Sequence, residues 1–223
     1  IKDAAYAAGA KKVYIMEEPM AAAIGAGLPI QEPIGSMIVD IGGGTTDVAV
    51  ISLGGIVTSR SIRVGGDVID AAIVNFIKNT YNLLIGERTA EEVKMAIGSA
   101  ARLNGESNAR IRGRDLVSGL PKDLMVSPKE IREAIEDQIA KIVGAIKATL
   151  DETPPDLVAD LSRTGIVLAG GGALLKGLSE RLMKETGMPV RVAADPLYSV
   201  VNGAGRCVEN IAMLQQILPP EKR

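Results

Sequence analysis

Short apolar runs bounded by glycine predict strands in the first third of the chain. Met37–Ile41 runs directly into three glycines, and Thr46–Leu53 follows as a second apolar run. The Gly54-Gly55 pair predicts a hairpin turn, after which Ile56–Val64 returns as a third strand. A shorter apolar run, Val13–Met16, predicts a buried strand upstream of this group.

Farther along, apolar residues recur every three to four positions, which is the spacing of a helix buried along one face. Two helix starts carry capping-box patterns, Thr89-Ala90-Glu91-Glu92 and Ser127-Pro128-Lys129-Glu130. The predicted helices of the first two thirds are Ile1–Ala8, Pro19–Ile24, Asp67–Tyr81, Thr89 through Ala100 and Ser127 through Leu150, with short strands at Ala109–Gly113 and Leu124–Val126.

The last third alternates between the two patterns. Strands are predicted at Gly165–Leu168 and Pro189–Val192, and helices at Ala173–Glu185 and Val200–Leu218. Strands that alternate with helices indicate an α/β fold.

Composition narrows the possible chemistry. The 223 residues are 47% hydrophobic and 23% charged, as in ordinary globular proteins, and a net charge of −2 argues against a nucleic-acid binder. Because the chain has no histidine and one cysteine, Cys207, its chemistry rests on carboxylates, hydroxyls, lysines and backbone amides. Its apolar runs are interrupted well before about 18 residues, so no transmembrane helix is predicted, and no signal-peptide pattern opens the chain.

The strongest local signal is Asp40-Ile41-Gly42-Gly43-Gly44-Thr45-Thr46-Asp47. Three glycines after a strand let backbone N–H groups approach an anion with no side chain in the way. A carboxylate beside such a phosphate cradle is useful when Mg²⁺ lies between them, because Mg²⁺ keeps several waters and is held by few carboxylates. The alternative is a glycine-rich hairpin in which Asp40 is a turn residue.

A second triple glycine, Gly170-Gly171-Gly172, joins a predicted strand to a predicted helix. Bare backbone at such a junction suits a phosphate or a flat ring. The spacing matches neither a Walker A loop nor G-x-G-x-x-G, and close packing of the strand on the helix explains the glycines equally well.

Two charged motifs also have a structural explanation. Glu17 and Glu18 precede a helix, where they complement its dipole, although one of them could instead orient an attacking water. Glu91 and Lys94 lie three residues apart on a predicted helix, and a solvated ion pair between them is the simplest interpretation.

These four motifs occur together, in this order, in one family. The chain resembles the MreB and Mbl type of bacterial actins over essentially its whole length. The resemblance is carried by Glu17–Gly27 and Leu84–Glu91 as well as by the two glycine loops. The glycine loops are shared across the actin and Hsp70 superfamily, whereas Glu17–Met20 and Ile85–Thr89 are far more specific to this branch. Val64–Asp67 and Arg112–Asp115 match it as well.

The resemblance implies an actin-like ATPase fold of the ribonuclease H-like class, with two lobes around a nucleotide cleft, and it implies ATP and Mg²⁺ as cofactors. Asp40 would hold Mg²⁺ through water, Glu18 would position the attacking water, and Thr45 would be its catalytic hydroxyl partner. The implied nucleotide-binding residues are Gly42, Gly43, Gly44 and Thr45 as the second phosphate loop, Gly170, Gly171 and Gly172 as the adenosine loop, and Glu91 and Lys94 on the adenine side.

The predicted elements and the resemblance together divide the chain. Residues 33–68 and 133–201 are expected to form one large subdomain, and residues 69–132 a smaller insertion in it. Residues 1–32 and 202–223 are expected to belong to the other lobe. Because Ile1 stands directly in a helical pattern without a start signal, we expect that lobe to be incomplete. The family's first phosphate loop would precede it, so the chain alone is expected to be inactive as an ATPase.

The resemblance implies a slowly hydrolysing, cytoplasmic ATPase that polymerises into filaments at the inner face of the cell membrane. There it would direct cell-wall synthesis and rod shape together with the cell-wall elongation machinery. Two alternatives belong to the same superfamily. A sugar or acetate kinase would need a substrate base that no motif here resembles, and an Hsp70-like chaperone would continue into a β-rich peptide-binding domain.

Overall fold

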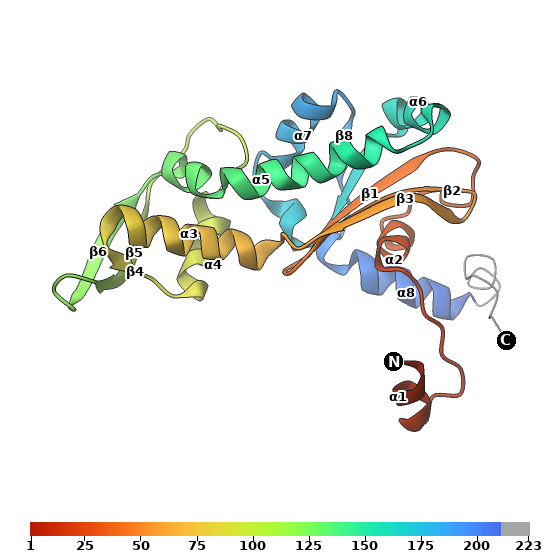
Figure 1. Cartoon of the computed structure of the whole chain (residues 1–223), viewed down its shortest axis with the longest axis horizontal. Helices are drawn as coiled ribbons and strands as arrows, with labels where there is room; N and C mark the ends of the chain where they lie inside the picture. Colours follow the sequence, from red (N-terminus) through yellow and green to blue (C-terminus); the bar gives the residue numbers. More distant parts are fainter. Residues whose placement is uncertain (211–223) are drawn as a thin grey trace.

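A five-stranded mixed sheet lies at the centre of the structure, a computed structural model that describes residues 1–210 (Figure 1). β1 pairs antiparallel with β2, as β2 does with β3, whereas β1 pairs parallel with β7 and β7 with β8. The spatial order is β3 (Gly55–Ile62), β2 (Thr46–Ser52), β1 (Ser36–Ile41), β7 (Ile166–Ala169) and β8 (Val190–Val192). The parallel strands β1 and β7 therefore end side by side.

β1 is buried on both faces because its residues alternate between two hydrophobic cores. Met37, Val39 and Ile41 pack into the larger core, and Ile38 packs into the smaller one. A strand that is covered on both faces reads as a continuous apolar run, which explains the sequence of β1. Asp40 interrupts this run on the same face as Ile38, and it is only 5% exposed.

Helices cover both faces of the central sheet. The long α5 (Pro128–Asp151) packs on β2 and β3, with α7 (Leu178–Thr186) beside it, and the other face carries α2 (Glu18–Gly25) and α8 (Ser199–Glu209). α5 begins with the predicted capping box, in which the Ser127 hydroxyl and the Glu130 carboxylate each accept from the other's backbone N–H. α6 (Pro155–Thr164) packs near the start of β1.

A separate three-stranded antiparallel sheet lies at the end where α5 begins (Figure 1). It consists of β4 (Leu83–Leu84), β5 (Ala109–Asp115) and β6 (Pro121–Val126). Between the two sheets lie α3 (Gly66–Tyr81) and α4 (Glu87–Ile97). These helices and α5 share the larger core, so one hydrophobic interior connects the two sheets.

The predicted α/β pattern is confirmed for most elements, but the strand at Val13–Met16 is wrong. Tyr14 and Ile15 are 41% and 53% exposed, and no strand of the described residues pairs with this segment. An apolar run becomes a strand only where a neighbouring strand satisfies its backbone groups. The segment leads instead from α1 (Lys2–Ala7), a helix without buried residues, into α2.

Two predicted helix boundaries are also wrong. α4 already begins at Glu87, after Gly86, so Thr89 lies inside the helix and its predicted capping box does not form. The predicted helix Ala173–Glu185 is divided into a 3₁₀ turn, η1 (Gly171–Leu174), and α7, because the chain turns at Gly177 with a φ of +72°. No pattern predicted α6, β4 or the 3₁₀ turn η2 (Pro196–Tyr198).

The last predicted helix, Val200–Leu218, is confirmed as α8 as far as Glu209, and its remainder lies outside the described residues. Within residues 1–210, no helix is both long and apolar enough to span a bilayer.

α2 and α8 cross at two glycines. A Cβ on Gly203 would lie 1.8 Å from the carbonyl oxygen of Ala21, and a Cβ on Gly25 would lie 1.7 Å from that of Ser199. Arg206 of α8 donates to the carbonyl oxygen of Ile24, at 2.7 Å, and so places a cation at the C-terminal end of α2. The helices can approach this closely only because both glycines lack a side chain.

We therefore predict that Gly203→Ala lowers the free energy of unfolding by about 1–3 kcal/mol, because the methyl group must push α2 and α8 apart. Gly205→Ala is the matched control on the same helix, since a Cβ there meets nothing within 4 Å. It should stabilise the protein by up to about 1 kcal/mol, as alanine favours a helix over glycine. Urea unfolding of both variants measures the difference, and equal effects would contradict the packing explanation.

Candidate functional site

The two glycine loops meet where β1 and β7 end. Asp40 pairs with Ala169 across the parallel strands, so Gly42 and Gly170 both follow directly at the same end of the sheet. A Cβ on Gly170 would lie 2.3 Å from the carbonyl oxygen of Ile41, and a Cβ on Gly172 would lie 2.2 Å from the Ile41 side chain. The carboxyl ends of parallel strands are a common location of ligand sites in α/β proteins.

The first loop rests on the beginning of α3. The carbonyl oxygens of Gly42 and Gly43 accept from the N–H groups of Gly66 and Asp67, both at 2.9 Å. A Cβ on Gly65 would lie 2.4 Å from the carbonyl oxygen of Gly43, so a side chain at position 65 would separate the loop from the helix. The Gly42 N–H donates to the carbonyl oxygen of Thr45.

The N–H groups of Gly43 and Gly44 differ from that of Gly42, because neither has a hydrogen-bond partner among the described residues. Gly43 and Gly44 are both exposed. Consecutive free N–H groups in a turn make a concave surface that attracts anions.

Lys94 joins α4 to α3. Its Nζ donates to Asp70 Oδ2 at 2.8 Å and to the carbonyl oxygen of Gly66 at 3.3 Å. Burial raises the pKa of Asp70, and the hydrogen bond and charge of Lys94 oppose that shift. Lys94 is thus committed to Asp70, so the simple interpretation of Glu91 and Lys94 as a solvated ion pair is wrong.

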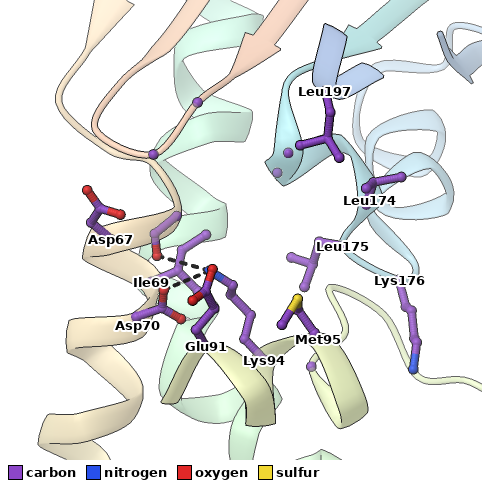
Figure 2. Close-up of a pocket in the computed structure, with 16 residues that line it drawn as sticks. Asp67, Ile69, Asp70, Glu91, Lys94, Met95, Leu174, Leu175, Lys176 and Leu197 are labelled. Atoms are coloured by element: carbon purple, nitrogen blue, oxygen red, sulfur yellow. Dashed lines mark hydrogen bonds and ion pairs between the residues drawn. The ribbon is translucent and has the colours of Figure 1, made fainter. Parts of the chain in front are cut away.

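A pocket of about 350 Å³ opens between these elements (Figure 2). One side is formed by the first loop and the start of α3, another by α4, and a third by η1 and the segment after it. Its lining residues are Gly42, Gly43, Gly66, Asp67, Ile69, Asp70, Glu91, Lys94, Met95, Gly98, Gly171, Gly172, Leu174, Leu175, Lys176 and Leu197.

The pocket brings together six of the residues that the sequence marks as nucleotide-binding, although they are far apart in the chain. They are Gly42, Gly43, Glu91, Lys94, Gly171 and Gly172. Gly44, Thr45 and Gly170 belong to the same two loops but are not among the lining residues, and neither are Asp40 and Glu18. Asp40 and Thr45 flank the first loop, and Glu18 begins α2, which covers the face of the sheet on which Asp40 lies.

Three carboxylates approach one another beside the first loop. Burial raises the pKa of Asp40 to about 6, and the negative charges of Glu18 and Asp47 add to the effect. Asp47 pairs with Asp40 across β1 and β2, and it accepts from the Thr45 hydroxyl at 2.9 Å. Glu18 is exposed at the start of α2. Negative charge is thus concentrated around the buried Asp40 carboxylate.

A magnesium ion that kept its water shell fits this cluster. No group of three or more acidic, histidine or cysteine side chains within residues 1–210 is arranged to hold a metal ion directly. Mg²⁺, however, is commonly bound by one or two carboxylates, with water and phosphate oxygens as its other ligands. Asp40 has the buried position and the unneutralised charge that such a contact requires.

Several pocket residues could not be identified from local patterns. Met95, Leu174 and Leu197 are each more than half exposed and give the pocket apolar walls. Apolar side chains at the surface carry no signal in the sequence, because single exposed hydrophobics are common in proteins. Asp67 and Asp70 follow the Gly65-Gly66 pair at the start of a helix. This glycine pair was the local pattern that could have indicated a ligand site near the two carboxylates.

Comparisons with known proteins agree on one family. The family described as MreB/Mbl protein matches residues 1–216. Cell shape-determining protein MreB of Escherichia coli (strain K12) is 51% identical over 213 residues, covering 96% of this chain and 61% of that protein. Cell shape-determining protein Mbl of Bacillus subtilis (strain 168) is 50% identical over 214 residues, covering 96% and 64%. The chain therefore spans about three-fifths of the length of these curated relatives.

Comparison with solved structures supports the same family. The crystal structure of MreB5 of Spiroplasma citri bound to ADP matches with a TM-score of 0.92 at 42% identity, covering 96% of this chain and 65% of that one. The MamK double helical filament matches with a TM-score of 0.71 at 26% identity, covering 87% and 59%. The expected fold class is confirmed: the chain has the actin-like ATPase fold, and it belongs to the MreB/Mbl family.

Proposed function

We propose that the pocket binds ATP and that the protein hydrolyses it slowly. The observation that carries this proposal is the convergence of two glycine loops, from the ends of β1 and β7, with Glu91 and Lys94 of α4 on one pocket. These segments are remote in the chain, and a nucleotide is a ligand large enough to contact all of them. MreB5 of Spiroplasma citri is described as bound to ADP and to AMPPNP in its crystal structures.

The two ends of the pocket suit the two ends of a nucleotide. The free N–H groups of Gly43 and Gly44 would face the phosphates, in the loop that Asp40 precedes in the chain. The apolar side chains of Leu174, Leu175 and Met95 suit a flat base. Glu91 repels phosphates but accepts hydrogen bonds, so we assign it to the nucleoside, where hydroxyl and amino groups are available as donors.

Hydrolysis would be a matter of positioning. The transition state of phosphoryl transfer is loose, so an enzyme gains mainly by orienting the water and by stabilising charge. Glu18 would orient the water, and Thr45, fixed by its hydrogen bond to Asp47, would be its hydroxyl partner. Asp40 would hold a hydrated Mg²⁺, which supplies positive charge to the phosphates.

We also propose that the protein assembles head to tail into filaments. In this proposal residues 33–68 and 133–201 form the large subdomain of one lobe, residues 69–132 its insertion, and residues 1–32 with 202–223 part of the other lobe. ATP would fix the angle between the lobes, and only one angle would suit stacking. The filaments would lie in the cytoplasm at the inner face of the cell membrane and direct the cell-wall elongation machinery and rod shape. The names of the relatives, cell shape-determining MreB and Mbl and the MamK filament, support this proposal.

Loss of the Glu91 carboxylate tests the nucleotide site. In the full-length protein, we expect Glu91→Ala to weaken ATP binding by about tenfold or more, because hydrogen bonds to a charged group contribute about 1.5–3 kcal/mol. Glu92→Ala is the matched control, since Glu92 pairs with Arg88 at the surface and does not line the pocket. Titration calorimetry measures both affinities, and two equally weakened variants would argue against this site.

Removal of the Glu18 carboxylate tests hydrolysis separately from binding. Glu18→Ala should slow single-turnover hydrolysis by about 100-fold or more, as expected for the loss of a positioned catalytic group, while the ATP dissociation constant stays within about twofold. Glu17→Ala, one residue earlier and also exposed, should leave the hydrolysis rate nearly unchanged. A large loss of affinity with unchanged hydrolysis would assign Glu18 a binding role instead.

Sedimentation tests assembly. The full-length protein should pellet with ATP and stay in the supernatant without nucleotide, because the nucleotide selects the lobe angle that stacks. The Glu91→Ala variant should need about tenfold more ATP for half-maximal pelleting, in proportion to its weaker binding. Pelleting that does not depend on nucleotide would contradict the coupling between the pocket and the filament.

A further inference from the structure

Two of the pocket walls are joined at one end of the pocket by a small hydrogen-bonded junction. The segment Ser99–Ala101 follows α4 and Gly98, and the segment Lys176–Gly177 follows η1. Ser99 and Lys176 form an isolated parallel β-bridge, and the N–H of Ala100 donates to the carbonyl oxygen of Lys176 at 2.7 Å. We call these two segments the pocket junction.

The junction is packed as well as hydrogen-bonded. Gly177 has a φ of +72°, and a Cβ there would lie 2.9 Å from the backbone nitrogen of Ala101. The Lys176 side chain donates to the carbonyl oxygen of Ala96 at 2.6 Å, in the last turn of α4. Movement of one segment therefore requires movement of the other.

Arg132 holds the junction from the first turns of α5. Its Nη1 donates to the carbonyl oxygen of Ala101 at 2.8 Å and also to the buried hydroxyl of Ser99. Both Nη atoms bind the Glu106 carboxylate, at 2.8 and 3.1 Å. The Arg132 side chain is 16% exposed, so water competes little for these bonds. Arg132 itself is not among the lining residues of the pocket.

The junction lies at one end of the pocket. Gly98 and Lys176, which line the pocket, are adjacent in the chain to Ser99 and Gly177 of the junction. Figure 2 shows Lys176 at the opposite side of the pocket from Asp67, which stands beside the first glycine loop. The junction is therefore at the end that we assign to the nucleoside.

We propose that Arg132 is a positioning residue for the nucleotide: by holding Ser99–Ala101 against Lys176, it fixes the distance between the α4 wall and the η1 wall and slows nucleotide release. The inference rests on the proposed nucleotide site. A nucleotide contacts both walls, so it leaves faster when the walls can separate. The guanidinium suits this role because its planar group of donors can bind two segments and a carboxylate at once.

The location of the junction distinguishes this role from a contact to the phosphates. The nucleoside is common to ATP and ADP, whereas the terminal phosphate is not. Loosening the nucleoside end should therefore speed the release of both nucleotides by the same factor. Loss of a contact to the terminal phosphate would affect ATP more than ADP.

The test is stopped-flow release of fluorescent ATP and ADP analogues from the full-length protein. We expect Arg132→Ala to raise the release rate of both nucleotides by about tenfold with little change in the association rate, because affinity changes within one site appear mainly in release. Arg132→Lys should be intermediate, since it keeps the charge facing Glu106 but cannot reach both Ser99 and Ala101.

Arg181 of α7 provides a matched control outside the pocket junction. From α7 it binds Glu136 of α5 with two hydrogen bonds, at 2.7 and 3.2 Å, and Glu185 with a third, and it is 23% exposed. None of these three residues lines the pocket. Arg181→Ala should lower stability to a similar degree as Arg132→Ala, measured by urea unfolding, and should leave nucleotide release unchanged.

Ser99→Ala keeps the inference testable if Arg132→Ala does not fold, because it removes one acceptor of Arg132 and leaves Glu106 paired. It should raise release of both nucleotides by about threefold. Unchanged release in Arg132→Ala and Ser99→Ala, or an equal rise in Arg181→Ala, would overturn the role of Arg132. Failure of the unmodified protein to bind either nucleotide would instead overturn the proposed function.

Discussion

The close approach of two glycine loops at the ends of β1 and β7 is the constraint on which the site depends. Parallel pairing brings Ile41 beside the second loop, where a Cβ on Gly170 or Gly172 would lie within 2.3 Å of Ile41. No side chain can occupy that space, so the walls of the pocket are bare backbone at this point. The same absence of side chains leaves the N–H groups of Gly43 and Gly44 free for a ligand.

The pairing of β1 with its neighbours also brings negative charges together at the end of β1. β1 is buried on both faces, so the Asp40 carboxylate at its end has little access to water, and Asp47 faces it from β2. The pKa of Asp40 is raised to about 6 because burial and two neighbouring carboxylates make its charged form less favourable. Within residues 1–210, no positively charged group lowers the pKa of Asp40. Strongly shifted pKa values of this kind are common at functional sites.

Patterns of local sequence predicted the elements well where one face is buried continuously. The strand Met37–Ile41 and the capping box at Ser127 were correct because a continuous apolar run and a cap can both be read from neighbouring residues. The strand at Val13–Met16 was wrong because pairing depends on a neighbour. The helix expected from Ala173 was interrupted because the turn at Gly177 is required by Ala101, a residue 76 positions away in the chain.

The candidate site was predictable only in part, for a similar reason. A run of three glycines is easy to recognise in a sequence, so Gly42, Gly43, Gly171 and Gly172 were identified as loop residues. The partner of Lys94 was not, because Asp70 lies one turn into a different helix and only the packing of α3 on α4 brings the two charges to 2.8 Å. No local sequence pattern identifies Leu174 and Leu197 as pocket residues, because they line a pocket only when α3 and α4 lie opposite them.

The pocket walls belong to three segments that are separate in the chain. The first loop and α3 are joined by backbone hydrogen bonds, and α3 to α4 by Lys94. The η1 wall is joined to α4 through Lys176 and the junction that Arg132 holds. A ligand that contacts all three walls adds its binding free energy to these few bonds and so stabilises one arrangement of the segments. Because coupling of this kind is reciprocal, a contact outside the pocket that fixes this arrangement would also tighten the binding of any ligand that spans the three walls.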